Sequence, residues 1–177
     1  LLEQIRNQNE YLRAKLGMEV KVVGMANSRK MLFDEEGIEL DADWKDHLMT
    51  NGDKADLAVF IGRMRDLNLS NSIFVDNTAN DKIAGYYAGI LDDSISISTP
   101  NKVANSSSYL QYQRLKSIAN KRGVQFHYET NVGAGLPIIS TLRDLMDSGD
   151  QIRKIEGVLS GSLSFIFNNF DGIRPFH

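Results

Sequence analysis

The sequence predicts an α/β fold built on a Rossmann-like, doubly wound parallel sheet. Short apolar segments with the length of strands alternate with helical patterns of about ten to twenty residues. Glycines stand where several of these helices would end, and short polar loops follow the apolar segments. Strands that are separated by helices form βαβ units, which pair their strands in parallel.

The first part of the chain predicts two helices and one strand. Residues 1–16 carry apolar side chains at helical spacing, and Gly17 follows as a C-cap. Residues 20–25 read as a short buried strand. Residues 31–53 are rich in acidic side chains and predict an irregular, solvated connection. A second helix is expected from residue 57 to about residue 67.

The rest of the chain alternates more regularly, up to a change of character near Gly149. There we expect a domain boundary: a Rossmann-like nucleotide-binding domain over residues 1–149 and the start of a second, α+β domain over residues 150–177. In the second part we predict strands at 73–76, 94–98, 124–128 and 152–159, and helices at 83–90, 109–122, 138–147 and from Ser160.

Composition narrows the functional class. The chain has 177 residues, of which 42% are hydrophobic and 24% charged, as in ordinary globular proteins. The formal net charge of -3 gives no general basic surface, so we expect no nucleic-acid partner. The sequence has no cysteine and no apolar run near the ~20 residues that span a bilayer. We therefore predict a cytoplasmic protein that does not contact a membrane.

The chain opens on what reads as the first helix of a dinucleotide-binding fold. Such a fold normally places a strand and a G-x-G-x-x-G loop before that helix, where the loop holds the pyrophosphate. No such loop occurs in the sequence. We therefore expect the chain to be part of a longer polypeptide that supplies the first strand and its glycine-rich loop.

Ligands of open parallel sheets bind beyond the carboxyl ends of the strands. Polar loops follow four of the predicted strands, at residues 26–30, 77–80, 99–102 and 129–137. In the first loop Asn27, Ser28 and Arg29 offer donors to a 2′-phosphate, and no carboxylate stands there to hold a ribose 2′-hydroxyl. This favours NADP over NAD, although solvated cations in a surface loop would give the same sequence.

Two further features could carry chemistry. Pro100 ends its strand sharply, which places Lys102 at the edge of the sheet, where it could assist proton transfer or simply begin a helix. Gly133 and Gly135 in the run from Glu129 to Pro137 allow a turn whose carbonyl oxygens point inward. With the Glu129 carboxylate, such a turn suits a hard cation, but a plain strand-to-helix turn is equally compatible.

Several of these stretches resemble homoserine dehydrogenases, in particular the form fused behind an aspartate kinase. The matching stretches are Val75–Thr78, Thr99–Asn105, Tyr128–Pro137 and Gly157–Phe167. The resemblance implies NAD(P)H-dependent reduction of aspartate 4-semialdehyde to homoserine, on the route to threonine and methionine, by an enzyme that is a homo-oligomer. It also implies a cofactor and substrate site that Asn77, Thr78 and Lys102 help to form. A monovalent cation, usually sodium, would be bound by Glu129 and by the carbonyls of Val132, Ala134 and Leu136.

The resemblance is incomplete, and it leaves one alternative open. The Asp and Lys with which the family's second domain binds substrate have no counterpart in this sequence, so we expect no homoserine oxidation by this chain alone. Aspartate-semialdehyde dehydrogenase, another NADP enzyme, needs a cysteine nucleophile that this chain lacks. A non-catalytic, nucleotide-binding regulatory module remains the alternative, because fold alone does not establish function.

Overall fold

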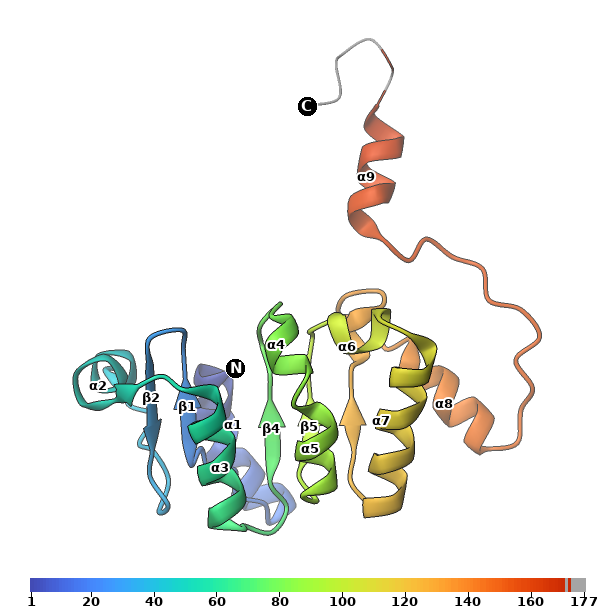
Figure 1. Cartoon of the computed structure of the whole chain (residues 1–177). Coiled ribbons are helices and arrows are strands. Elements are labelled where there is room, and N and C mark those ends of the chain that lie inside the picture. Colours follow the sequence, from blue (N-terminus) through green and yellow to red (C-terminus); the bar gives the residue numbers. More distant parts are fainter. Residues whose placement is uncertain (171, 173–177) are drawn as a thin grey trace. The chain divides into compact units, whose positions relative to one another are not determined.

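The computed structural model describes residues 1–170 and 172. These residues form two compact units, which divide between Ser70 and Asn71. Each unit contains a three-stranded sheet with helices around it (Figure 1). The predicted α/β class is confirmed, and the parallel sheet lies in the second unit.

The first unit has an antiparallel sheet of order β1-β2-β3. Met25, Ile38 and Leu48 form its buried core, against which Trp44 and Leu2 pack. The predicted first helix is confirmed and ends at Gly17, whose φ of 61° suits glycine. In order, the elements are α1 (Leu2–Tyr11), the π-helical turn η1 (Leu12–Leu16), β1 (Gly24–Ala26), β2 (Lys30–Phe33), α2 (Trp44–Asn51), β3 (Asp53–Lys54) and α3 (Leu57–Leu67).

Two expectations for this unit were wrong. Residues 31–53 are not an irregular connection: they contain most of β2, all of α2 and the start of β3. The apolar run Met31–Phe33 pairs with β1, and Leu48 fills the core, so burial outweighs the acidic character of the segment. The strand predicted at 20–25 is the short β1, which forms an antiparallel hairpin with β2 instead of joining a parallel sheet.

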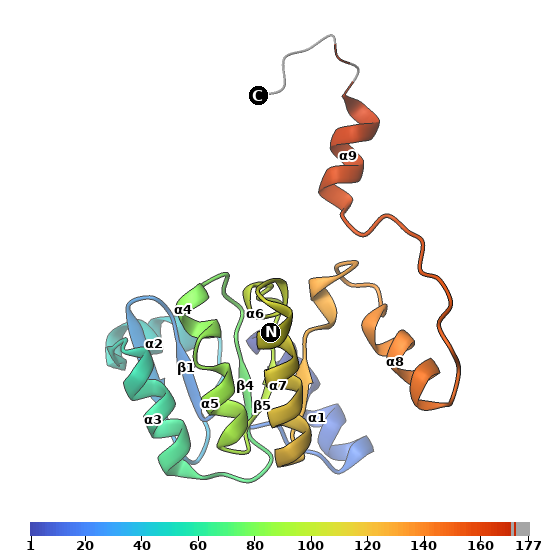
Figure 2. The same cartoon turned by 45° about the vertical axis from the view of Figure 1, so that its right-hand side comes forward.

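The second unit contains the parallel sheet, of order β4-β5-β6. Its register aligns Phe74, Ile97 and Phe126 across the three strands, and all three side chains are buried. Helices α5 and α7 pack beside each other on one face of this sheet (Figures 1 and 2). In order, the elements are β4 (Ile73–Val75), α4 (Asp81–Ala84), α5 (Tyr87–Asp92), β5 (Ser96–Ser98), α6 (Val103–Ser106), α7 (Tyr109–Arg122), β6 (Phe126–His127), the 3-10 turn η2 (Glu129–Asn131), α8 (Ile139–Asp147) and α9 (Gly161–Asn169).

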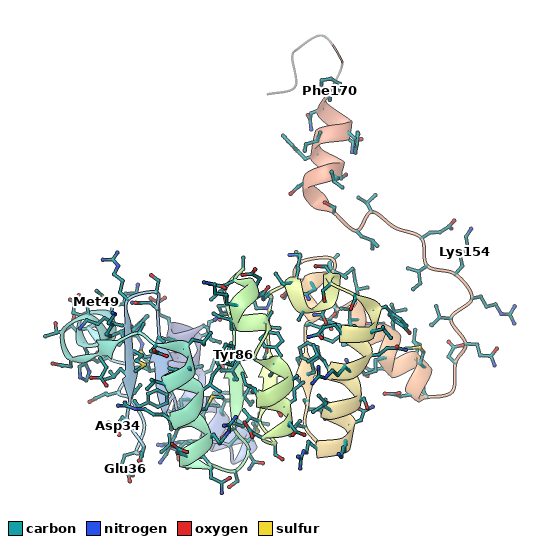
Figure 3. All side chains as sticks on the ribbon, viewed as in Figure 1. Asp34, Glu36, Met49, Tyr86, Lys154 and Phe170 are labelled. Atoms are coloured by element: carbon teal, nitrogen blue, oxygen red, sulfur yellow. The ribbon has the colours of Figure 1, made fainter. Side chains whose placement is uncertain are left out.

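The predicted strand at 152–159 is absent. Residues 150–159 run as an extended segment, in which Lys154 is labelled (Figure 3). None of the strands that the structure describes pairs with this segment. A strand needs a hydrogen-bonding neighbour, and without one an apolar pattern alone does not form sheet. The helix predicted from Ser160 is present as α9, and the Ser160 side chain accepts a hydrogen bond from the backbone N–H of Leu163.

The domain boundary near residue 150 stays a prediction, and part of the predicted second domain, residues 171 and 173–177, lies outside the described residues. Within the residues that the structure describes, no helix has both the length and the apolar character that crossing a membrane requires.

Candidate functional site

Three polar loops lie at the carboxyl edge of the parallel sheet. They follow β4, β5 and β6 and consist of residues 76–80, 99–102 and 128–138. Figure 1 shows α4 and α6 at the same end of the strands. The edge at which the sequence predicts ligand binding is therefore formed by three neighbouring loops of one unit.

A buried polar network underlies two of these loops. Tyr87 of α5 is fully buried, and its hydroxyl donates to Asp76 Oδ2 at 2.6 Å and lies 3.0 Å from Thr99 Oγ1. Thr99 Oγ1 donates to the carbonyl of Asp76 at 2.8 Å, and Asn101 Nδ2 donates to Asp76 Oδ2 at 3.0 Å. Asp76, Thr99 and Asn101 are each no more than 3% exposed. Buried polar groups with complete hydrogen bonding fix geometry strongly, so this network holds the two loops together.

Burial perturbs the Tyr87 hydroxyl. Its pKa is raised above the ordinary tyrosine value, first by burial and next by the hydrogen bond to Asp76. The hydroxyl therefore stays protonated and remains a donor to the Asp76 carboxylate.

The loop after β4 presents the predicted residues Asn77 and Thr78 at the surface. The backbone N–H of Thr78 donates to Asp76 Oδ1 at 2.8 Å, and Thr78 Oγ1 accepts the N–H of Asn80 at 3.1 Å. The Asn80 side chain in turn caps α4 through the N–H of Lys82. Side-chain to backbone bonds thus set this loop and leave its outer face open to a ligand.

Lys102 follows the buried Asn101 and is itself exposed. It stands at the N-cap position of α6, where its side chain makes no capping bond and its carbonyl accepts the N–H groups of Asn105 and Ser106. The ammonium group is therefore carried by a fixed backbone at the sheet edge, as expected from the sequence.

The turn after β6 connects Glu129 to α8. Both carboxylate oxygens of Glu129 accept backbone hydrogen bonds, from the N–H groups of Ile139 and Ser140 at 2.8 Å each. Gly133 and Ala134 have φ angles of 70° and 52°, and a Cβ at Gly133 would collide with the Ile138 side chain. The sequence predicted a special turn here, but not that its carboxylate caps the following helix.

Three buried side-chain atoms near these loops have no hydrogen-bond partner among the described residues: Nδ2 and Oδ1 of Asn105, and Oδ1 of Asn131. Asn131 is the last residue of η2, which begins at Glu129, and Asn105 lies in α6, which follows Lys102 in the sequence. Buried polar groups without partners are rare and are normally satisfied by water or a ligand. Among the described residues, no group of three or more His, Asp or Glu side chains could hold a metal ion.

Asn27, Ser28 and Arg29 lie in the other unit, in the hairpin turn between β1 and β2. Asn27 Oδ1 accepts the N–H groups of Arg29 and Lys30 at 2.8 and 2.9 Å, so this side chain shapes the turn. Ser28 and Arg29 are exposed. Their part in binding a phosphate stays a prediction, as do the roles of Thr78, Lys102 and the cation ligands.

Sequence reasoning missed the residues that build the buried network, namely Tyr87, Thr99 and Asn101, together with Asn131. Tyr87 occurs at an apolar position of a helical pattern, so the sequence predicts a core side chain and gives no sign that its hydroxyl takes part in a network. Thr99 and Asn101 flank Pro100, in the loop for which the sequence predicts a functional role of Lys102 alone. The two polar residues beside this strand-ending proline are the sequence feature that could have indicated the network.

Comparison with known proteins shows which family the chain belongs to. The model of the homoserine dehydrogenase NAD-binding domain matches residues 1–129, and a second homoserine dehydrogenase model matches residues 137–177. The chain belongs to the homoserine dehydrogenase family. The family is one of oxidoreductases that bind a nicotinamide cofactor in this domain.

Individual relatives agree with the family match. The chain is 43% identical over 177 residues to bifunctional aspartokinase/homoserine dehydrogenase 1, chloroplastic, of Arabidopsis thaliana, covering 99% of this chain and 19% of that protein. A crystal structure of a Candida auris protein of unknown function is 36% identical, with a TM-score of 0.76 over 93% of this chain and 45% of that one. A hyperthermophilic archaeal homoserine dehydrogenase in complex with NADPH shares the fold, with 21% identity and a TM-score of 0.58 over 78% of this chain and 44% of that one.

The chain spans about a fifth of the length of the bifunctional relatives that it matches.

Proposed function

We propose that this chain forms the nicotinamide-nucleotide-binding part of a homoserine dehydrogenase, and that the polypeptide carrying it reduces aspartate 4-semialdehyde to homoserine with NADPH. The family match does not favour the alternative of a non-catalytic regulatory module. The structural observation that carries the proposal is the hydrogen-bonded network of Asp76, Tyr87, Thr99 and Asn101. It places the loops of Thr78 and Lys102 at one edge of the parallel sheet.

The residues at this edge fit a nicotinamide cofactor. The loops of Thr78 and Lys102 offer a hydroxyl and an ammonium group, and the unpartnered amide atoms of Asn105 and Asn131 can hydrogen-bond a polar ligand or the water around it. Bound NADPH would supply a hydride to the aldehyde carbon. Lys102 would stabilise the negative charge that develops on the carbonyl oxygen, which then takes up a proton to give the hydroxyl of homoserine.

NADPH is the proposed form of the cofactor. The hairpin turn carries Asn27, Ser28 and Arg29, and the exposed guanidinium of Arg29 can form two parallel hydrogen bonds to a 2′-phosphate. No carboxylate lies in this turn to receive the 2′-hydroxyl of NAD.

A monovalent cation is proposed for the turn after β6, with sodium as the first candidate. Its ligands would be the carboxylate of Glu129 and the carbonyl oxygens of Val132, Ala134 and Leu136, a donor set of oxygen atoms only. The Leu136 carbonyl already accepts the N–H of Ile138, but a carbonyl oxygen has two lone pairs. Glu129 would then join the cation to the first turn of α8.

The oligomeric and cellular predictions remain proposals as well. We propose that the intact enzyme is a homo-oligomer and is located in the cytoplasm, and the name of the Arabidopsis relative places that protein in the chloroplast. Size-exclusion chromatography with light scattering, and fractionation of cells of the source organism, test the two proposals.

Turnover by the full polypeptide that carries this chain tests the proposed activity. We expect homoserine-dependent reduction of NADP⁺, with kcat/KM for NADP⁺ exceeding that for NAD⁺. Arg29→Ala should lower kcat/KM for NADP⁺ about tenfold and leave kcat/KM for NAD⁺ nearly unchanged. Arg29 can pair with the 2′-phosphate of NADP⁺, and NAD⁺ has no such phosphate. Arg13→Ala, which removes an exposed arginine paired with Glu19 in the same unit, is the matched control. Absence of homoserine oxidation would overturn the activity, and a preference for NAD⁺ would overturn the cofactor assignment.

A further inference from the structure

Asn101 makes hydrogen bonds to all three loops at the carboxyl edge. Its side-chain Nδ2 donates to Asp76 Oδ2 and to the carbonyl of Asn80, each at 3.0 Å, in the loop after β4. In its own loop, Oδ1 accepts the N–H of Val103 at 3.1 Å. Its carbonyl accepts Nδ2 of Asn131, in the turn after β6, at 3.5 Å.

The chemistry of these contacts requires an amide. One end of the side chain must donate two hydrogen bonds, to a carboxylate and to a carbonyl, while the other end accepts one from a backbone N–H. Aspartate would set a second carboxylate against Asp76, and leucine would leave several buried groups unsatisfied. At 2% exposure, water cannot replace these partners without opening the loops.

We propose that Asn101 is a positioning residue, which fixes the loops of Thr78, Lys102 and Glu129 relative to one another and thereby sets the affinity for the nicotinamide cofactor. Asn101 acts through Asp76 and through the backbone, because its own side chain is buried. The inference rests on the proposed function, because that function supplies the ligand whose affinity is measured.

Asn101→Ser separates the local role from the positioning role. A serine hydroxyl can still accept the N–H of Val103 and keep the turn, but it is too short to donate to both Asp76 and Asn80. Loss of two hydrogen bonds should weaken NADPH binding about tenfold, as measured by NMR or fluorescence titration. Backbone amide resonances should shift at Thr78 and Asn131 as well as at Val103.

Ile90→Val is the matched control for general destabilisation. Ile90 is fully buried in α5 and takes no part in the network, so this variant should lower the thermal midpoint while NADPH affinity stays within about twofold. The exchange variant Asp76→Asn/Asn101→Asp restores an amide-to-carboxylate pair with the groups reversed. It should recover part of the affinity that Asn101→Asp alone loses.

The outcomes separate this inference from the proposed function. NADPH affinity of folded Asn101→Ser within about twofold of wild type would overturn the positioning role, as would amide shifts confined to residues 99–103. If the unaltered chain does not bind NADPH at all, the proposal that this chain binds the cofactor is overturned. The amide shifts caused by Asn101→Ser then decide by themselves whether Asn101 fixes the three loops. If Asn101→Ser is unfolded, Asn131→Ala decides: shifts at Lys102 support the role, and shifts limited to residues 129–133 overturn it.

Discussion

At the scale of single residues, the main feature of the site is a buried carboxylate surrounded by neutral donors. Asp76 receives the hydroxyl of Tyr87, the amide of Asn101 and the backbone N–H of Thr78. These donors come from α5 and from two loops, so the carboxylate connects parts of the chain that are distant in sequence. A buried charge that lost one of these donors would be left partly unsatisfied.

Tyr87→Phe tests this arrangement through stability. The variant keeps the ring, which lies edge-on to Phe126, and removes only the hydroxyl. We expect the free energy of unfolding at neutral pH to fall by about 1–3 kcal/mol, measured by urea denaturation. A change below about 0.3 kcal/mol would show that the hydroxyl contributes nothing to the network.

The stability difference between wild type and Tyr87→Phe should depend on pH in alkali. The folded-state pKa of Tyr87 is raised above the unfolded value of about 10, so its contribution is complete below that pH and declines as the pH rises toward the folded pKa. The stability difference between wild type and Tyr87→Phe should therefore shrink above about pH 10.

At the scale of elements, Glu129 links the turn that follows β6 to helix α8, because its side chain caps that helix. The side chain lies ten and eleven residues before the N–H groups that it accepts, so it is a long-range cap. Partial burial raises the pKa of Glu129, but the hydrogen bonds from the backbone of Ser140 and Ile139 outweigh it and lower the pKa overall. The contribution of the cap is present above the unfolded pKa of about 4.3 and is lost as the pH falls through the folded value.

Glu129→Gln should raise hydrogen exchange at Ile139 and Ser140, measured by NMR, because a neutral amide accepts these bonds more weakly. In wild type, the protection of these amides relative to their intrinsic exchange rate should fall in the same way as the pH drops below the unfolded pKa of about 4.3. Sodium chloride, compared with choline chloride at equal ionic strength, should slow exchange in wild type and not in the variant. Glu156→Gln, a neutralised exposed carboxylate in the same unit, is the control. Equal exchange in wild type and Glu129→Gln would contradict the capping role, and equal exchange in the two salts would contradict the cation site.

Elements with strong local signals were predictable. Helix α7 has a Ser108 cap, apolar residues at helical spacing and a C-terminal Gly123 with a φ of 68°, and its limits match the prediction. The hairpin of β1 and β2 was not predictable in the same way. Hydrophobic periodicity predicts that a segment is a strand, but it does not predict which strand pairs with it. The role of Asn27 in the turn follows only from the structure, in which its side chain accepts the N–H groups of Arg29 and Lys30.

The same contrast holds for the candidate site. The edge of the sheet and the loops of Thr78, Lys102 and Glu129 followed from strand order and loop composition. The interior of the site did not, because Tyr87 and Asn101 acquire their roles only through Asp76, which lies 11 and 25 residues away in the sequence.

At the scale of the whole molecule, the residues proposed to bind the cofactor are divided between two compact units. Asn27, Ser28 and Arg29 belong to the unit Leu1–Ser70, and Thr78, Lys102 and the turn after β6 belong to the second. A ligand that binds the folded chain and not the unfolded chain stabilises the folded state, so NADPH should raise the thermal midpoint of the chain by mass action.

The central claim is that a nicotinamide cofactor binds at the carboxyl edge of β4, β5 and β6. An NMR titration of the isotope-labelled chain with NADPH tests it most directly, and it detects weak binding. The account predicts saturable shifts at the amides of Thr78, Lys102 and Asn131, while Ser94 and Gly123, before the amino ends of β5 and β6, stay unchanged. Shifts centred on Ser94 and Gly123, or none at any NADPH concentration reached, would contradict it.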